Sequence, residues 1–205
     1  MTPEARAKIM EAMFAGLKRN QAATSPETAV PDSAADEVRR LTGSAIRRAA
    51  EELRKSGDTS DLFGFALCTD DDVRSVYHVA STREWVRQEE AHYPGIGFIY
   101  VEWVHSANEQ LFDAVSSALG THADQDYGSA AGGNAARDRR FQSLVLALKD
   151  CRDEGVFDEN TFLCVGSTDP SEHLESLAMK GVDLINPKIL ADQFANALEY
   201  GKYRG

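Results

Sequence analysis

A β-strand pattern is clearest in residues 62–80, where apolar side chains recur at every second position. Both faces of the first run, residues 62–68, are apolar, which is typical of a strand inside a sheet. A second run, residues 73–80, follows a cluster of three aspartates. Two such runs separated by a short polar cluster predict a hairpin with the aspartates at its tip, because aspartate tolerates turn geometry and accepts hydrogen bonds from nearby backbone amides.

Apolar residues recur at helical spacing in most of the remaining chain. We expect strands in two further apolar runs, residues 97–104 and 161–167. Residues 121–134 are rich in glycine and small polar residues, so we expect a loop there, after a helix that stops at Gly120. The helices that the pattern predicts cover residues 3–17, 33–56, 82–93, 106–119, 134–153, 171–181 and 188–200.

The order of these elements favours one fold class. Strands and helices do not alternate regularly, which argues against a doubly wound parallel sheet. An α+β fold, with a small mostly antiparallel sheet packed by several helices, fits the order best. Residues 20–32 are rich in alanine, serine, threonine and proline and indicate a linker. We therefore divide the chain into an N-terminal helical extension with its linker, residues 1–32, and a single α+β domain, residues 33–205.

The charge balance is the unusual part of the composition. The 205 residues include 33 acidic and 22 basic side chains, which gives a formal net charge of −11. Such a field repels nucleic-acid phosphates, so we expect no nucleic-acid partner. It also speeds encounter with a basic protein. A negative charge that only keeps the protein in solution is the simpler alternative.

Cysteine usage and the apolar runs bear on the cellular location. The three cysteines are widely spaced and do not form a disulfide framework. Two of them lie in apolar runs, as buried free thiols do, which indicates a reducing compartment. The first residues lack the apolar core of a secretory signal, and no apolar run approaches the roughly 20 residues that span a bilayer. We therefore expect a cytoplasmic protein without a membrane partner.

Few residues are spaced as in known catalytic or metal sites. Asp70, Asp71 and Asp72 lack the ligand spacing and the glycine of a calcium loop. None of the five histidines pairs with another histidine or a cysteine at zinc-ligand spacing. The chain has neither a phosphate-binding P-loop nor a G-x-S-x-G nucleophile elbow. We therefore expect no metal, no cofactor and no catalytic residue, while a site built from scattered positions stays open.

A ligand site is the main alternative for the glycine-rich loop. The helix after this loop carries Arg139 and Arg140 in its first turns, where free backbone amides and guanidinium groups can hold an anion. Glu102 and Asp169 would complete a polar site there, and the protein would then be an enzyme or a small-ligand protein. A flexible loop before a solvated helix is the simpler interpretation.

Several short words of the sequence resemble, in order, one bacterial family. They are "FALCTDDDVRSVYHVASTREW", "VEW", "RRFQSLVLALKDCRDEGVF", "FLCVGSTDPSE" and "LINP", within residues 60–200. The family is known only as domain of unknown function 4303, so no catalytic residue is carried over from it. The resemblance implies a compact intracellular α+β protein, similar in style to the small acidic immunity proteins encoded beside bacterial toxins.

These observations together favour a non-enzymatic protein-binding module, specifically an immunity protein that neutralises a cognate bacterial toxin through an acidic surface. The expected partner is a basic protein. If the N-terminal helix forms a homodimer, the chain would be a structural subunit instead. The candidate partner-binding residues are the acidic tip, a second acidic cluster and two aromatic residues: Asp70, Asp71, Asp72, Tyr77, Trp85, Asp153 and Glu154.

Overall fold

The computed structural model describes residues 33–56, 61–126 and 133–202. The expected N-terminal helix and linker lie outside these residues, so they, and the homodimer that the helix would form, stay predictions. No helix in the described part is apolar over a length that could cross a membrane. The elements are α2 (Ser33–Lys55), β1 (Leu62–Thr69), β2 (Val76–Thr82), α3 (Arg83–Glu90), η1 (Ile96–Phe98), η2 (Tyr100–Glu102), η3 (Glu109–Phe112), α4 (Asp113–Asp126), α5 (Gly133–Asp153), β3 (Phe162–Ser167), α6 (Glu172–Ile185) and α7 (Lys188–Lys202).

The three strands form one mixed sheet in the order β2-β1-β3. β1 pairs with β2 in antiparallel register, with Leu62 opposite Thr82, so the predicted hairpin is confirmed. β1 pairs with β3 in parallel, with Gly64 opposite Phe162. A parallel pairing requires a long connection between the two strands, which β2, α3, α4 and α5 supply. The α+β class with a small sheet packed by helices is confirmed, and one of the two strand pairings is antiparallel.

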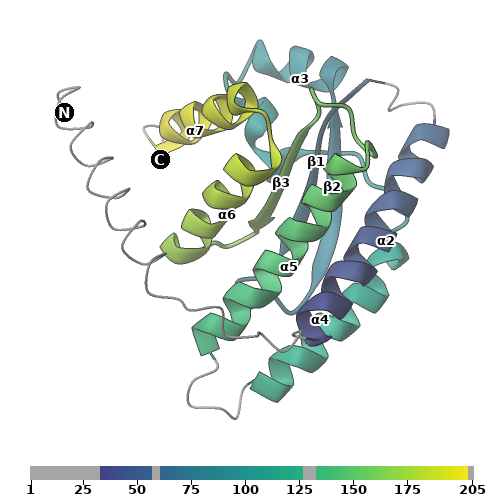
Figure 1. Cartoon of the computed structure of the whole chain (residues 1–205). Helices are drawn as coiled ribbons and strands as arrows, with labels where there is room; N and C mark the ends of the chain where they lie inside the picture. Colours follow the sequence, from purple (N-terminus) through teal and green to yellow (C-terminus); the bar gives the residue numbers. More distant parts are fainter. Residues whose placement is uncertain (1–32, 57–60, 127–132, 203–205) are drawn as a thin grey trace. The chain divides into compact units, whose positions relative to one another are not determined.

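Helices and one irregular segment cover the two faces of the sheet (Figure 1). On one face, α2, α4 and α5 close a core that contains the fully buried Phe65, Leu144 and Leu148. On the other face, residues 93–104 and α7 close a smaller core around Phe162. α6 lies along β3 and contributes side chains to both cores. β1 is therefore covered on both faces, in agreement with the two apolar faces of its sequence.

Side chains occupy both edges of this sheet. On β3, the buried Asn186 amide accepts a hydrogen bond from the backbone N–H of Leu163 (2.8 Å) and donates to its carbonyl (2.7 Å). On β2, the Ser116 hydroxyl bonds both the N–H (3.0 Å) and the carbonyl (3.1 Å) of Val76. The backbone of Ala80 is paired as well. A strand offered by a partner would find these backbone groups occupied.

The strand predicted at residues 97–104 is wrong, because the segment forms the short 3₁₀ turns η1 and η2. Tyr100 lies against Gly166 of β3, where an added Cβ would be 2.1 Å from the tyrosine hydroxyl oxygen. Trp103 lies against Gly64 of β1, where an added Cβ would be 2.3 Å from the indole ring. Two glycines on neighbouring strands thus admit aromatic rings onto the backbone, and the segment covers the sheet instead of joining it.

The helix expected to stop at Gly120 continues to the end of α4 at Asp126. Leu119 and Ala123 are buried on its inner face, so packing outweighs the low helix propensity of glycine. The part of the predicted loop that the structure describes before residue 127 is therefore helical.

Candidate functional site

The aspartate cluster forms the hairpin tip, and Asp70 organises it. Its carboxylate accepts hydrogen bonds from the backbone N–H groups of Asp72 (3.0 Å), Arg74 (3.0 Å) and Ser75 (2.9 Å) and from the Ser75 hydroxyl (2.6 Å). Partial burial raises the pKa of Asp70, but these hydrogen bonds together outweigh burial and hold the pKa below its usual range. The carboxylate of Asp70 is thus used within its own loop, as turn chemistry predicts.

Arg140 holds the tip from α5. Its guanidinium donates to the carbonyls of Val73 (3.2 Å) and Asp72 (3.1 Å) and pairs with the Asp126 carboxylate (2.7 Å) at the end of α4. Val73 is fully buried and has a φ of 53°, a left-handed conformation that strains a β-branched residue. Arg140 therefore stabilises a strained turn, and all three of its guanidinium nitrogens are engaged by the protein itself.

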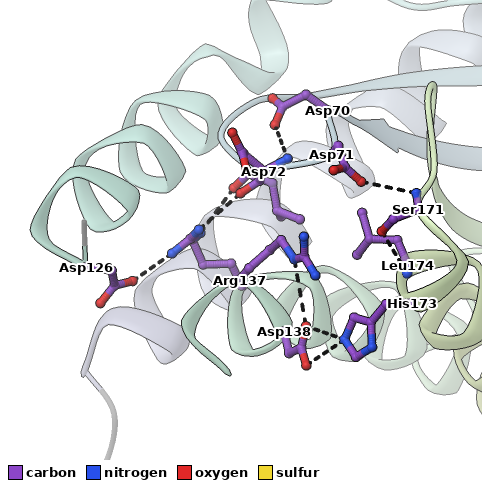
Figure 2. Close-up of polar contacts among 11 residues, drawn as sticks. Asp70, Asp71, Asp72, Asp126, Arg137, Asp138, Ser171, His173 and Leu174 are labelled. Atoms are coloured by element: carbon purple, nitrogen blue, oxygen red, sulfur yellow. Dashed lines mark hydrogen bonds and ion pairs between the residues drawn. The ribbon is translucent and has the colours of Figure 1, made fainter. Parts of the chain in front are cut away.

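Further contacts join the tip and α5 to the start of α6 (Figure 2). Asp71 accepts a hydrogen bond from the backbone N–H of Ser171 (3.2 Å), whose hydroxyl caps α6. On α5, Asp138 contacts His173 through both carboxylate oxygens (2.9 Å each) and lies 3.9 Å from the Nε of Arg137. Most polar groups of this cluster are therefore hydrogen-bonded within the protein, and the cluster joins the ends of three elements.

The second acidic cluster is also paired and lies elsewhere. Glu154 forms a bidentate pair with Arg47 (2.8 Å for both bonds), and Asp153 bonds Lys149 (2.5 Å). Asp153 ends α5, roughly 20 Å along the helix from Arg140, which holds the tip. The structure does not bring the two predicted acidic patches together, and their role in docking stays a prediction.

The residues of the alternative ligand site come from separate elements. Arg139 and Arg140 lie on α5, Glu102 is exposed on η2, and Asp169 is exposed in the turn after β3. Arg140 is committed to the hairpin tip, and the glycine-rich loop, residues 127–132, lies outside the described residues. A ligand site at this loop therefore stays a prediction.

The buried thiols and the buried histidine are poorly suited to acid–base or nucleophilic chemistry. Burial raises the pKa of Cys68 to about 12 and that of Cys151 to about 11, and it raises the pKa of Cys164 as well. Burial lowers the pKa of His78 to about 4. At neutral pH all four side chains are thus uncharged. The described residues also contain no group of three or more histidine, cysteine or acidic side chains placed to hold a metal ion.

Exposed apolar side chains gather on residues 93–104, the segment that follows α3. Tyr93, Ile99, Val101 and Val104 are 58%, 37%, 50% and 63% exposed. They are four of the eight large apolar side chains that are exposed in the described part of the chain. We call these four side chains the 93–104 surface. The sequence pattern did not indicate it, because an apolar run is equally compatible with a buried strand.

Buried anchors alternate with these exposed residues and hold the segment in place. The Trp103 indole donates to the carbonyl of Gly97 (3.1 Å), and the Tyr100 hydroxyl donates to the carbonyl of Ser167 (2.9 Å). Phe98 packs against the smaller core. The 93–104 surface is therefore presented on a segment with a fixed conformation, which lowers the conformational cost of binding.

Acidic and aromatic residues lie on the segment that carries the 93–104 surface and on elements that contact this segment. Glu89 of α3 and Glu102 of η2 have no ion-pair partner within the described residues. Of the predicted aromatic residues, Trp85 of α3 is half-buried and packs against the smaller core. Tyr77 of β2 is 41% exposed, and its hydroxyl is hydrogen-bonded to the Cys68 thiol.

One family model matches the part of the chain that contains these features. The family model for a domain of unknown function, DUF4303, matches residues 43–187. This range includes the hairpin, the 93–104 surface and the whole of α6. No curated protein and no solved structure matches the chain.

Proposed function

We propose a protein-binding function for this chain, which belongs to the DUF4303 family, a domain of unknown function. In this proposal the chain is a non-catalytic module whose 93–104 surface docks a protein partner that presents apolar side chains surrounded by basic ones. The specific form of the proposal is an immunity protein that neutralises a toxin by covering part of its surface.

The observation that carries the proposal is the exposure of the 93–104 surface. Contiguous exposed apolar patches are typical of protein interaction sites, whereas single exposed apolar residues are common on any surface. Four exposed apolar side chains within twelve residues support a patch of the first kind. The cluster contains Tyr93, and tyrosine is enriched among the residues that contribute most to binding energy. Hydrogen bonds from the Tyr100 and Trp103 side chains hold the segment against the sheet. The segment therefore loses little conformational entropy when a partner binds.

Charge supports a basic partner. The chain carries a formal net charge of −11, which accelerates encounter with a positively charged protein at low ionic strength. Glu89 on α3 and Glu102, which lies between Val101 and Val104 in sequence, supply negative charge close to the 93–104 surface. The acidic tip and the Asp153–Glu154 pair contribute to the overall field, but most of their carboxylates are engaged by neighbouring side chains or backbone amides.

A matched pair of variants tests the docking site. In Val101→Ser/Val104→Ser, the exposed apolar area of the 93–104 surface is reduced without a change of charge. In Leu184→Ser, a side chain of similar exposure (46%) is changed on α6, outside that surface. Full-length wild type and both variants are immobilised and used to capture proteins from the source cell, with quantitative mass spectrometry as readout. Any protein retained by wild type is then purified and its Kd measured against all three.

The proposal expects a basic protein whose Kd rises roughly tenfold or more for Val101→Ser/Val104→Ser and stays unchanged for Leu184→Ser. Equal affinities for all three forms would refute the docking site. The toxin form of the proposal is tested separately by co-expression, where wild type restores growth of cells that express the captured partner and the double variant does not. A partner that is harmless on its own would overturn the toxin form and leave the docking site standing.

A further inference from the structure

A groove of about 970 Å³ opens at the amino-terminal ends of β1 and β3, the end opposite the hairpin tip. Its walls come from the end of α2, the start of α3, the turn before β3 and the start of α7. A volume of this size is typical of small-molecule sites. The side chains of the 93–104 surface are not part of its described lining, so the groove is a separate feature of the molecule.

Three arginines from three helices brace the turn before β3. Arg54 of α2, Arg83 of α3 and Arg152 of α5 each donate to backbone carbonyls within residues 156–161. Of these, Arg54 and Arg83 line the groove. Backbone carbonyls orient a guanidinium group without neutralising its charge, so the turn holds positive charge at the groove wall.

The charges of the groove are unequally matched. Arg83 pairs with Asp61 (2.9 Å), and the carboxylate of Asp158 accepts hydrogen bonds from the backbone N–H (2.9 Å) and the side-chain amide (3.2 Å) of Asn160. Arg54 has no carboxylate within ion-pair distance among the described residues, and its Nε and Nη1 form no hydrogen bond there. The Glu51 carboxylate of the same helix is paired with Lys55 and also interacts electrostatically with Arg54. Within the described residues the groove lining thus holds one guanidinium, Arg54, without an ion-pair partner, and one carboxylate, Asp158, that is hydrogen-bonded only by neutral amide groups.

Apolar side chains form a second part of the groove lining, beside polar residues that include Thr161 and Gln193. Leu53 and Phe157 form buried parts of its lining, and Phe63 and Leu190 are partly exposed to it. Ile189 also lines the groove and is 67% exposed, more than any other large apolar side chain in the described part of the chain. A ligand with an apolar body would remove this side chain from water, whereas an inorganic anion alone would leave it exposed.

We infer that this groove binds a small amphiphilic anion. Arg54 holds the carboxylate or phosphate head group, and the apolar body lies against Phe63 and Ile189. A guanidinium suits such a head group because its parallel N–H donors match two oxygens of a carboxylate or phosphate. This site is separate from the 93–104 surface. The ligand inference can therefore be wrong while the proposed function is right, and the proposed function can be wrong while the ligand inference is right.

Three probes with the same ten-carbon chain separate the head group from the body: decanoate, decyl phosphate and decyltrimethylammonium. Each is titrated, below its micelle concentration, into the isotope-labelled full-length chain, and backbone amide signals are followed by NMR. The two anions are expected to shift the signals of Phe63, Phe157 and Leu190 saturably, and the cation to bind at least roughly tenfold more weakly. Tighter binding of decanoate assigns a carboxylate head group to the natural ligand, and tighter binding of decyl phosphate assigns a phosphate.

Variants of α2 show whether Arg54 is the residue that binds the head group. Arg54→Gln is expected to weaken binding of the preferred anion roughly tenfold. Arg48→Gln, an exposed arginine of the same helix outside the groove, should leave it unchanged, as should Val104→Ser. Arg54→Lys keeps the charge and should give an intermediate Kd, which separates loss of charge from loss of folding. Equal Kd values for Arg54→Gln and Arg48→Gln, equal binding of the cation, or shifts confined to signals outside the groove would overturn the inference.

Discussion

At the scale of single residues, Asp70 is the clearest case of a carboxylate that serves the fold. We expect Asp70→Ala to lower the free energy of unfolding by about 2–4 kcal/mol, because the backbone N–H groups of Arg74 and Ser75 lose a charged acceptor. Urea unfolding at neutral pH measures this change. Asp72→Ala removes the exposed member of the cluster and should change stability by no more than about 0.5 kcal/mol.

The pH dependence of that difference follows from the lowered pKa of Asp70. A group with a lowered folded-state pKa contributes its stability above the unfolded pKa, about 3.9 for aspartate, and loses it as the pH falls through the folded value. The gap between wild type and Asp70→Ala should therefore be full at neutral pH and should narrow in strong acid. A gap that stays constant down to about pH 2 would contradict the assignment.

His78 gives a second prediction at this scale. It is stacked between Phe65 and Phe112, and its Nε2 accepts a hydrogen bond from the backbone N–H of Ala107 (2.8 Å), so the proton of the neutral ring lies on Nδ1. Burial lowers its pKa to about 4, although the charge of Glu52 partly opposes this shift. The histidine pKa of the unfolded chain is about 6.5. Between about pH 6.5 and pH 4, the unfolded chain therefore binds a proton at His78 and the folded protein does not.

Stability should therefore be fully present above about pH 6.5 and should fall as the pH drops toward 4, with a slope of up to about 1.4 kcal/mol per pH unit from this one group. His78→Gln keeps an acceptor near Ala107 and removes the titration, so the slope between pH 6.5 and 5 should flatten. Unfolding free energies measured across this range give the slope. His92→Gln, on an exposed histidine, is the control, and an equal flattening in both variants would refute this role for His78.

At the scale of elements, Asn186 closes the free edge of β3. Its side chain bonds both backbone groups of Leu163 and also donates to the carbonyl of Val182 (3.0 Å). We expect Asn186→Ala to destabilise the protein by about 2–4 kcal/mol, because two buried backbone groups of β3 lose their partner. Urea unfolding tests this, with Gln142→Ala on the exposed side of α5 as control. Equal stability of the two variants would show that α6 covers this edge without Asn186.

The sequence predicted some elements well and others poorly, for a physical reason. The hairpin, α2 and α5 were predictable because strand alternation, helical periodicity and turn chemistry are local properties of the chain. The turns at residues 93–104 were not, since their conformation depends on Gly64 and Gly166, which admit aromatic rings from a distant segment. The sequence shows an apolar run at residues 97–104. It does not show which strand backbone this run will pack against in the fold.

The candidate site was predictable to a similar extent. The structural role of the aspartates followed from turn chemistry. The pairing of the second acidic cluster did not, because Arg47 and its partner Glu154 lie 107 residues apart in sequence. The packing of α2 against α5 brings them together. A charged residue that the sequence suggests is free to bind a partner can thus form an ion pair within the fold. The exposed apolar residues of the 93–104 surface could be identified only from the structure.

At the scale of the whole molecule, negative charge should act on the rate of association. Glu89→Gln/Glu102→Gln removes two carboxylates beside the 93–104 surface, and we expect a slower association rate and a weaker dependence of that rate on salt, with a smaller change in dissociation. Stopped-flow association kinetics with the purified partner at two ionic strengths measure both. Glu51→Gln, on an exposed acid of α2, is the control for the loss of a carboxylate away from that surface. Identical salt dependence in wild type and the double variant would remove the steering role of these carboxylates.

Hydroxyl-radical footprinting of the chain, alone and in complex with its captured partner, tests the central claim most directly. Tyr93 and Val104 are 58% and 63% exposed in the free chain and should become protected by at least roughly threefold in the complex if they are buried centrally. Leu184, 46% exposed on α6, should react equally in both states. Protection confined to residues outside 93–104, with Tyr93 and Val104 unchanged, would show that the partner docks elsewhere.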